Sequence, residues 1–139
     1  MNHRDFKVAA MGYEKLFSPL RIRGCTFSNR IMATAAVTRL AAEDGHVTDA
    51  FKERYQRMAR GGVGAMVVEA AIVLPSKSSF NLRVSDDQFI SELKELIDGI
   101  HLAHSDVKIG LQLIHLEARD PVTGYTEMRA LAYRIRKGY

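Results

Sequence analysis

The chain has 139 residues, of which 47% are hydrophobic and 26% charged, the composition of an ordinary globular domain with a core. Its net charge of +4 does not predict a nucleic-acid partner, because acidic and basic residues are mixed along nearly the whole sequence. Cys25 is the one cysteine, which excludes an internal disulfide and argues against a zinc site, and no apolar run approaches the ~20 residues of a membrane span. We therefore expect a cytoplasmic protein with no metal site and no nucleic-acid or membrane partner.

A β-hairpin is the first element that the sequence predicts. Residues 1–12 have the composition of a loose leader and lack the apolar core of a secretory signal. Apolar and polar side chains then alternate over residues 16–27, and Gly24 stands where a hairpin turn would fall. We take residues 13–139 as one domain that opens with this hairpin.

A strand and a helix follow the hairpin. Residues 31–37 form a short apolar run of small side chains, which is typical of a buried strand. Thr48 is a favourable N-cap for a helix that Gly61 and Gly62 would end. The predicted apolar face of this helix consists of Phe51, Tyr55, Met58 and Ala59.

The next segment repeats this pattern. Residues 63–74 are almost wholly apolar, interrupted mainly by Glu69, which indicates a strand covered on both faces. A polar loop over residues 75–85 leads to a second helix, which Asp86 would open. Its predicted apolar stripe consists of Leu93, Leu96, Ile97 and Ile100.

A third strand and helix are predicted last. Residues 108–115 are apolar except for Gln112, and a turn-rich loop over residues 120–124 precedes a helix that Thr126 would cap. The apolar stripe of that helix would be Met128, Leu131, Ala132 and Ile135. This alternation implies a parallel sheet covered by helices, either a small doubly wound sheet or the first three βα units of a (β/α)8 barrel, which needs about 250 residues when complete.

Polar residues near the strand ends are the candidates for chemistry, because parallel α/β folds bind ligands there. Gln112 carries donor and acceptor atoms that would complement the edge of a flavin-like ring, although a structural amide is the commoner explanation of such a residue. His115 lies at the same strand end and is by itself more often structural than catalytic. Glu69 needs a cation or hydrogen bonds, which Arg30 or Arg119 could supply, and we interpret it as structural.

Other features of the sequence are less specific. The small residues 33–36 would let a planar ligand approach the backbone, but they equally suit tight packing. The motifs GxGxxG, GxxxxGK[ST], HExxH, CxxC and GxSxG do not occur. The glycines of residues 61–64 follow a helix and precede a strand, which is the reverse of the order that a phosphate cradle requires.

Several short motifs follow one another along the chain: LFSPL at residues 16–20, NRI at 29–31, AEDGHVT at 42–48, RGGVG at 60–64 and QLIH at 112–115. In this order they resemble the old yellow enzyme-like branch of the NADH:flavin oxidoreductase / NADH oxidase family. The resemblance extends roughly over residues 13–119.

The resemblance implies an N-terminal fragment of a (β/α)8 TIM barrel with FMN at the carboxyl mouth of the strands. It implies that the segment of Ala35, Ala36 and Val37, the region of Ala70 and the side chain of Gln112 meet the flavin, with His115 near the site in a substrate or structural role. The implied activity passes hydride from NAD(P)H to FMN and then to an activated alkene or related small molecule.

This sequence departs from the family pattern in three places. Val37 stands where many relatives carry a threonine or cysteine near the flavin, and the segment after His115 is longer than the common form. The sequence also stops before a fourth strand, so the family's substrate-binding pair and phosphate-binding loops have no counterpart. We therefore expect a partial FMN-binding domain over residues 13–139.

Two alternatives remain open at this stage. The chain could be a non-catalytic α/β fragment that forms homo-oligomers through open sheet edges, or a small doubly wound binding domain without a flavin role. Under the fragment interpretation, we expect the isolated chain to be oligomeric or partly unfolded and to retain little flavin.

Overall fold

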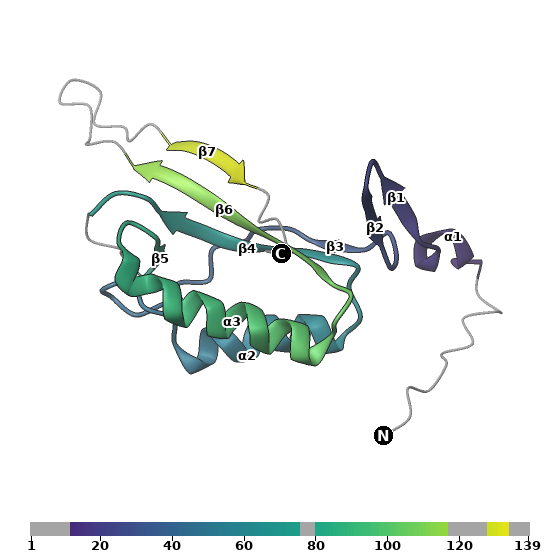
Figure 1. Cartoon of the computed structure of the whole chain (residues 1–139), viewed down its shortest axis with the longest axis horizontal. Coiled ribbons are helices and arrows are strands. Elements are labelled where there is room, and N and C mark those ends of the chain that lie inside the picture. Colours follow the sequence, from purple (N-terminus) through teal and green to yellow (C-terminus); the bar gives the residue numbers. More distant parts are fainter. Residues whose placement is uncertain (1–11, 76–79, 117–127, 134–139) are drawn as a thin grey trace.

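The computed structural model describes residues 12–75, 80–116 and 128–133, and these form one sheet with two long helices on one face and a separate hairpin (Figure 1). The elements in chain order are α1 (Glu14–Phe17), β1 (Leu20–Ile22), β2 (Cys25–Phe27), β3 (Met32–Ala33), α2 (Asp49–Arg60), β4 (Ala65–Ile72), β5 (Leu82–Arg83), the 3-10 turn η1 (Asp87–Phe89), α3 (Ile90–Ala103), β6 (Lys108–Leu116) and β7 (Met128–Tyr133).

The predicted hairpin is confirmed. Strands β1 and β2 pair antiparallel with Leu20 opposite Phe27 and Ile22 opposite Cys25, which leaves Arg23 and Gly24 in the turn. The left-handed backbone conformation falls on Arg23, at φ 52°, and not on Gly24. The short helix α1 before the hairpin was not predicted. The predicted leader, residues 1–12, lies outside the described residues except for Gly12.

The first long helix forms as its sequence predicts. The backbone N–H of Phe51 donates to the Thr48 side chain over 3.2 Å, so Thr48 is the N-cap, and the helix stops at Gly61. Phe51, Tyr55 and Ala59 are buried, whereas Met58 is half-buried at the edge of this face. The Thr48 hydroxyl also donates to the Leu40 carbonyl over 2.5 Å and so ties the preceding loop to the helix start.

Replacing Thr48 with alanine is expected to lower the free energy of unfolding by about 1–2 kcal/mol, because the helix loses its cap. The measurement is urea denaturation followed by circular dichroism. Thr48→Ser keeps a hydroxyl at the cap and serves as the control, with an expected change below about 0.5 kcal/mol. An equal loss in both variants would show that the cap contributes nothing.

The second long helix, α3, begins at Ile90 and not directly after Asp86, because the 3-10 turn η1 comes first. Asp86 accepts a hydrogen bond from the backbone N–H of Gln88 over 3.0 Å and caps the 3-10 turn η1, after which α3 continues. Leu96 and Ile100 of the predicted stripe are fully buried, while Leu93 packs at the edge of the core. Helices α2 and α3 pack against each other over the same face of the sheet (Figure 1).

The central sheet has the strand order β3-β4-β6-β7, with β5 also paired to β4. Strands β3, β4, β5 and β6 run parallel to their neighbours, as the alternation of strands and helices predicts. The predicted strand over residues 31–37 is too long, since only Met32 and Ala33 pair with β4. The predicted loop over residues 75–85 contains the short strand β5, which takes the same edge of β4 further along, at Ala71 and Ile72.

The prediction of a last helix is wrong. Residues 128–133 form β7, which pairs antiparallel with β6 from Leu116 opposite Met128 to Leu111 opposite Tyr133. The physical reason is that β6 would otherwise end the sheet with unpaired backbone groups, and β7 satisfies them. The predicted cap Thr126 and the turn at residues 120–124 lie outside the described residues. Of the predicted three βα units, the structure thus shows two helices between three parallel strands.

None of the helices among the described residues is both long and apolar enough to cross a membrane.

Candidate functional site

A β-bulge in β4 shapes the centre of the sheet. In the pairing with β6, Val68 lies opposite Leu111 and the next matched pair is Ala71 with Leu113, so Glu69 and Ala70 together face Gln112. Such a bulge shifts the alternation of side chains by one residue. The bulge therefore joins two of the predicted site positions, Ala70 and Gln112, across one strand pair.

The shift in β4 is visible in the core. Before the bulge, Met66 and Val68 pack with the helices, and after it Ala71 takes that side. Ala70 and Ile72 instead pack with Ile114 in a small second cluster. Successive side chains of a strand point to opposite faces, so this second cluster lies on the face away from the helix-side cluster. Helices α2 and α3 cover only one face of the sheet (Figure 1).

Gln112 belongs to this uncovered face. Its neighbours Leu111 and Leu113 pack against the helix-side cluster, so strand alternation places Gln112 with Ile114 on the other side. The side chain is half-buried, and no hydrogen bond to it is recorded within the described ranges. His115 is half-buried, and the same alternation places it on the face opposite Gln112.

The segment of Ala35, Ala36 and Val37 lies in the loop that follows β3, not in a strand. Ala35 is half-buried, Ala36 is exposed, and Val37 is 54% exposed. The next residue, Thr38, is bonded to Glu69 on β4. The structure thus ties this loop to the bulge through the contacts between Thr38 and Glu69.

The Glu69 carboxylate is the polar centre of this region, with a side chain that is 0% exposed. The backbone N–H of Thr38 donates to Oε1 over 2.9 Å, and the Thr38 hydroxyl lies 3.0 Å from Oε1 and 2.9 Å from Oε2. The Tyr55 hydroxyl donates to Oε2 over 3.2 Å and accepts from the Glu69 N–H over 2.8 Å. Burial raises the pKa of Tyr55 well above its ordinary value, so the phenol stays protonated and remains a donor.

The predicted ion pair of Glu69 is not found among the described residues. The Arg30 Nε donates to the Ser18 hydroxyl over 3.2 Å, and Arg119 lies outside the described residues. Of the two kinds of partner expected for Glu69, a cation or hydrogen bonds, the hydroxyl groups of Thr38 and Tyr55 supply hydrogen bonds. Sequence patterns did not reveal these partners, because Tyr55 counted only as part of an apolar helix face and Thr38 fell at the end of a predicted strand.

Two of the sequence motifs meet in space, which the sequence did not reveal. Asn29 donates through Nδ2 to the Gly62 carbonyl over 2.7 Å, and its Oδ1 accepts from the N–H groups of Gly64 and Ile31 over 2.9 and 3.0 Å. These hydrogen bonds of Asn29, here called the Asn29 clasp, connect the NRI segment to the RGGVG segment. They hold the starts of β3 and β4 side by side.

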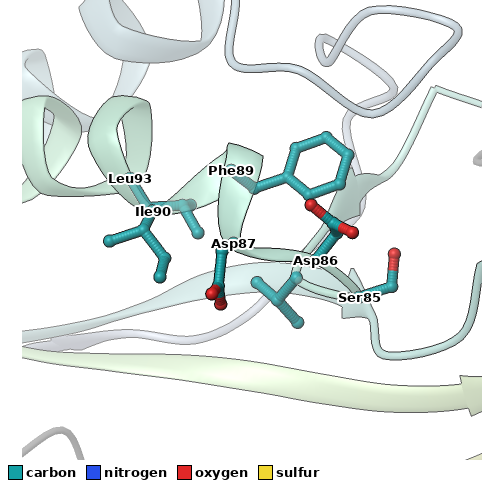
Figure 2. A pocket seen from close by; sticks show the side chains of 7 residues that line it. Ser85, Asp86, Asp87, Phe89, Ile90 and Leu93 are labelled. Atoms are coloured by element: carbon teal, nitrogen blue, oxygen red, sulfur yellow. The ribbon is translucent and has the colours of Figure 1, made fainter.

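A shallow hollow of about 240 Å³ lies elsewhere, between the end of β5 and the start of α3. Figure 2 shows Asp86 and Asp87 at this hollow, on the turn that leads into α3. The Asp86 side chain caps the 3-10 turn η1, and Val84 packs with the helix-side core. The hollow is therefore part of the helix layer and not of the face that carries Gln112. No group of three metal-binding side chains occurs in the part of the chain that the structure covers.

These features define the class of protein: a partial parallel α/β barrel whose candidate ligand groups gather at the carboxyl ends of its strands. The sequence profile of the NADH:flavin oxidoreductase / NADH oxidase family matches residues 15–130, and the chain belongs to this family. Members of the family are FMN-dependent oxidoreductases that use NAD(P)H as reductant and act on small molecules. The predicted family, cofactors and barrel class are thereby confirmed.

The related proteins match this chain over only part of their own length. An NADPH dehydrogenase of Listeria monocytogenes is 35% identical over 104 residues, which are 73% of this chain and 30% of that protein. An NADH oxidase of Thermoanaerobacter brockii is 35% identical over 118 residues, which are 83% of this chain and 18% of that protein. The chain therefore spans about a third of the relatives' length or less.

Solved structures agree with this family. The old yellow enzyme of Trypanosoma cruzi superimposes with a TM-score of 0.62 at 26% identity, over 81% of this chain and 33% of that one. An old yellow enzyme homologue of Zymomonas mobilis superimposes with a TM-score of 0.65 at 23% identity, over 77% of this chain and 30% of that one. The second likeness supports the fold alone.

Proposed function

We propose that this chain supplies the first part of an FMN site, on the uncovered face of the sheet at the carboxyl ends of β3, β4 and β6. The observation that carries the proposal is Gln112, a half-buried amide without a recorded hydrogen-bond partner in the described segments, opposite the bulge at Ala70. An amide at such a position can both donate to and accept from the polar edge of a ligand.

The residues of the site fit a flavin ring. The Gln112 amide would donate to and accept from the polar edge of the ring, while the small side chain of Ala70 leaves room above the strand. The loop residues Ala35, Ala36 and Val37 would meet the ring mainly through their backbone. Val37 carries no hydroxyl or thiol, so this position would shape the site without a hydrogen bond to the flavin.

In the whole activity, FMN would carry hydride between NAD(P)H and an activated alkene or related acceptor. This chain would bind and orient the flavin ring and exclude water from one side of it. His115, on the opposite strand face from Gln112, would have a structural role or lie near the substrate. Residues 13–139 would form a partial barrel domain, and the isolated chain would bind FMN weakly.

Replacing Gln112 with alanine is expected to weaken FMN binding about tenfold or more, because hydrogen bonds that fix a ligand are worth about 1–3 kcal/mol. The measurement is titration of flavin fluorescence with the purified chain. Gln88→Ala is the control, since Gln88 is exposed on η1, remote from Ala70. Equal dissociation constants for both variants and the wild type would contradict the assigned role of Gln112.

The second candidate function is self-association without catalysis. Strand β3 ends the sheet, and large apolar side chains near that edge and on the hairpin are exposed, including Met32 at 54% and Ile22 at 52%. An unpaired edge with apolar neighbours favours association with another copy. Gel filtration of the chain with and without FMN separates the candidates: a sharply eluting monomer that binds FMN speaks for the flavin site, and a colourless oligomer speaks for association.

A further inference from the structure

Burial of the Glu69 carboxyl group in an apolar strand costs folding free energy. It interrupts an apolar strand, its side chain is wholly buried, and no lysine or arginine lies within salt-bridge distance of it among the residues that the structure covers. A buried carboxylate is expensive unless its oxygens are hydrogen-bonded, and an apolar residue of similar size would cost nothing. Glu69 therefore calls for an explanation beyond strand formation.

The contacts of Glu69 all lead to the loop after β3 or to helix α2. Oε1 accepts the Thr38 N–H at 2.9 Å, and the Thr38 hydroxyl lies 2.9 Å from Oε2. The Leu40 N–H in turn donates to the Thr38 hydroxyl over 3.3 Å. Between them, Arg39 takes a left-handed conformation at φ 58°. The loop is also tied to α2 through the Leu40 carbonyl, and the Glu69 carboxylate supplies its side-chain bonds to strand β4.

The same carboxylate is anchored from the other side. Tyr55 of α2 donates to Oε2 over 3.2 Å, and its oxygen accepts the Glu69 N–H that the bulge removes from the ladder, over 2.8 Å. All the recorded partners of the carboxylate oxygens are N–H or O–H donors. One side chain thus joins three elements: the loop after β3, the bulged strand and the covering helix.

We propose that Glu69 is a positioning residue of the flavin site, acting through Thr38. Glu69 precedes Ala70 in the bulge that faces Gln112, and Thr38 follows Val37 in the loop. The carboxylate thereby sets the distance between the two groups of residues that would meet the ring on either side. Glu69 and Thr38 need not touch the flavin themselves. This inference rests on the proposed function, since it assigns the network a role only if the flavin binds there.

The experiment uses the full chain and replaces Thr38, because a Glu69→Ala variant is at risk of not folding. Thr38→Val removes the hydroxyl at nearly constant volume, and Thr38→Ser restores it. Thr26→Val is the matched control. Thr26 is exposed on β2, and its side chain makes no hydrogen bond to another described residue. Two quantities are measured for each variant: amide hydrogen exchange of residues 34–40 without ligand, and the dissociation constant for FMN by fluorescence titration.

We expect Thr38→Val to speed exchange in residues 34–40 about tenfold and to raise the FMN dissociation constant about five- to tenfold, as for the loss of one charge-assisted hydrogen bond. Thr38→Ser should restore both values to within about twofold of the wild type, and Thr26→Val should change neither. A Glu69→Gln variant that folds should resemble Thr38→Val, because one acceptor oxygen becomes a donor.

The outcomes separate this inference from the proposed function. Faster exchange with an unchanged dissociation constant would overturn the positioning role, while the flavin site would stand if Gln112→Ala still weakens binding. Unchanged exchange would likewise overturn it, because the network would then not hold the loop. Absence of FMN binding by the wild-type chain would overturn both the proposed function and the inference built on it.

Discussion

Replacing Phe51 with alanine is expected to lower the free energy of unfolding by about 3–5 kcal/mol. The Phe51 side chain is 0% exposed in the cluster between α2, α3 and the sheet, and its ring centroid lies 4.9 Å from that of Tyr55. Deleting the ring leaves a cavity that the surrounding elements fill only partly. The loss is large against the total stability of about 5–15 kcal/mol that domains usually have.

The measurement for Phe51→Ala is urea denaturation followed by far-ultraviolet circular dichroism. Phe17→Ala is the control, because Phe17 on α1 is 45% exposed and the same atoms are removed. We expect the control to cost below about 1 kcal/mol, as is usual for exposed sites. Equal losses for the two variants would mean that the helix layer is not the core that stabilises the chain.

The long elements could be predicted because their sequence patterns are local. The spacing of Phe51, Tyr55 and Ala59 indicates a helix face whatever the rest of the chain does, and Thr48 marks its start. The continuous apolar runs of β4 and β6 indicate strands buried on both faces. Local patterns of this kind also produced the incorrect last helix.

The incorrect helix shows where local patterns stop being informative. Met128, Leu131 and Ala132 fit a helical stripe, yet residues 128–133 form strand β7. The choice was decided by β6, whose free edge accepts a partner strand, and the sequence of residues 128–133 contains no information about that edge. The short β3 has the same explanation, since the length of a strand depends on the neighbour with which it pairs.

The candidate site was predicted as a set of residues but not as an arrangement. The motif QLIH singled out Gln112 by resemblance, whereas its position opposite a bulge follows from the register of two strands about 40 residues apart. Likewise, Glu69 was noted as a buried charge, but its partners Thr38 and Tyr55 come from separate elements. Such contacts are properties of the packed fold, because each residue alone has an ordinary local role.

Replacing Gly64 with alanine is expected to lower the free energy of unfolding by about 2–6 kcal/mol, through overpacking of about 1–3 kcal/mol and the loss of hydrogen bonds worth about 1–3 kcal/mol. A Cβ atom at Gly64 would lie 2.7 Å from the Asn29 carbonyl oxygen and 3.0 Å from the Asn29 nitrogen. These are backbone atoms, which cannot rotate away as a flexible side chain could.

The Asn29 clasp makes the close contact between a Cβ atom at Gly64 and the Asn29 backbone hard to relieve. The Gly64 N–H donates to Asn29 Oδ1 over 2.9 Å, and its carbonyl accepts from the Lys108 N–H over 3.1 Å at the start of β6. Moving Gly64 away from Asn29 would therefore disturb the starts of β3, β4 and β6 together. This arrangement gives a physical reason for glycine in the RGGVG segment beside the NRI segment: the backbone and side chain of Asn29 lie too close to Gly64 to admit a Cβ atom.

Gly24→Ala is the control for this prediction, because a Cβ atom at Gly24 would meet nothing within 4 Å and its φ is not positive. We expect that variant to be neutral or slightly more stable, since alanine restricts the unfolded chain more than glycine does. Both variants are compared with the wild type by thermal and urea denaturation. A Gly64→Ala protein as stable as Gly24→Ala would mean that the Asn29 clasp yields without cost, and the register of β3 against β4 would then have to be held by the core alone.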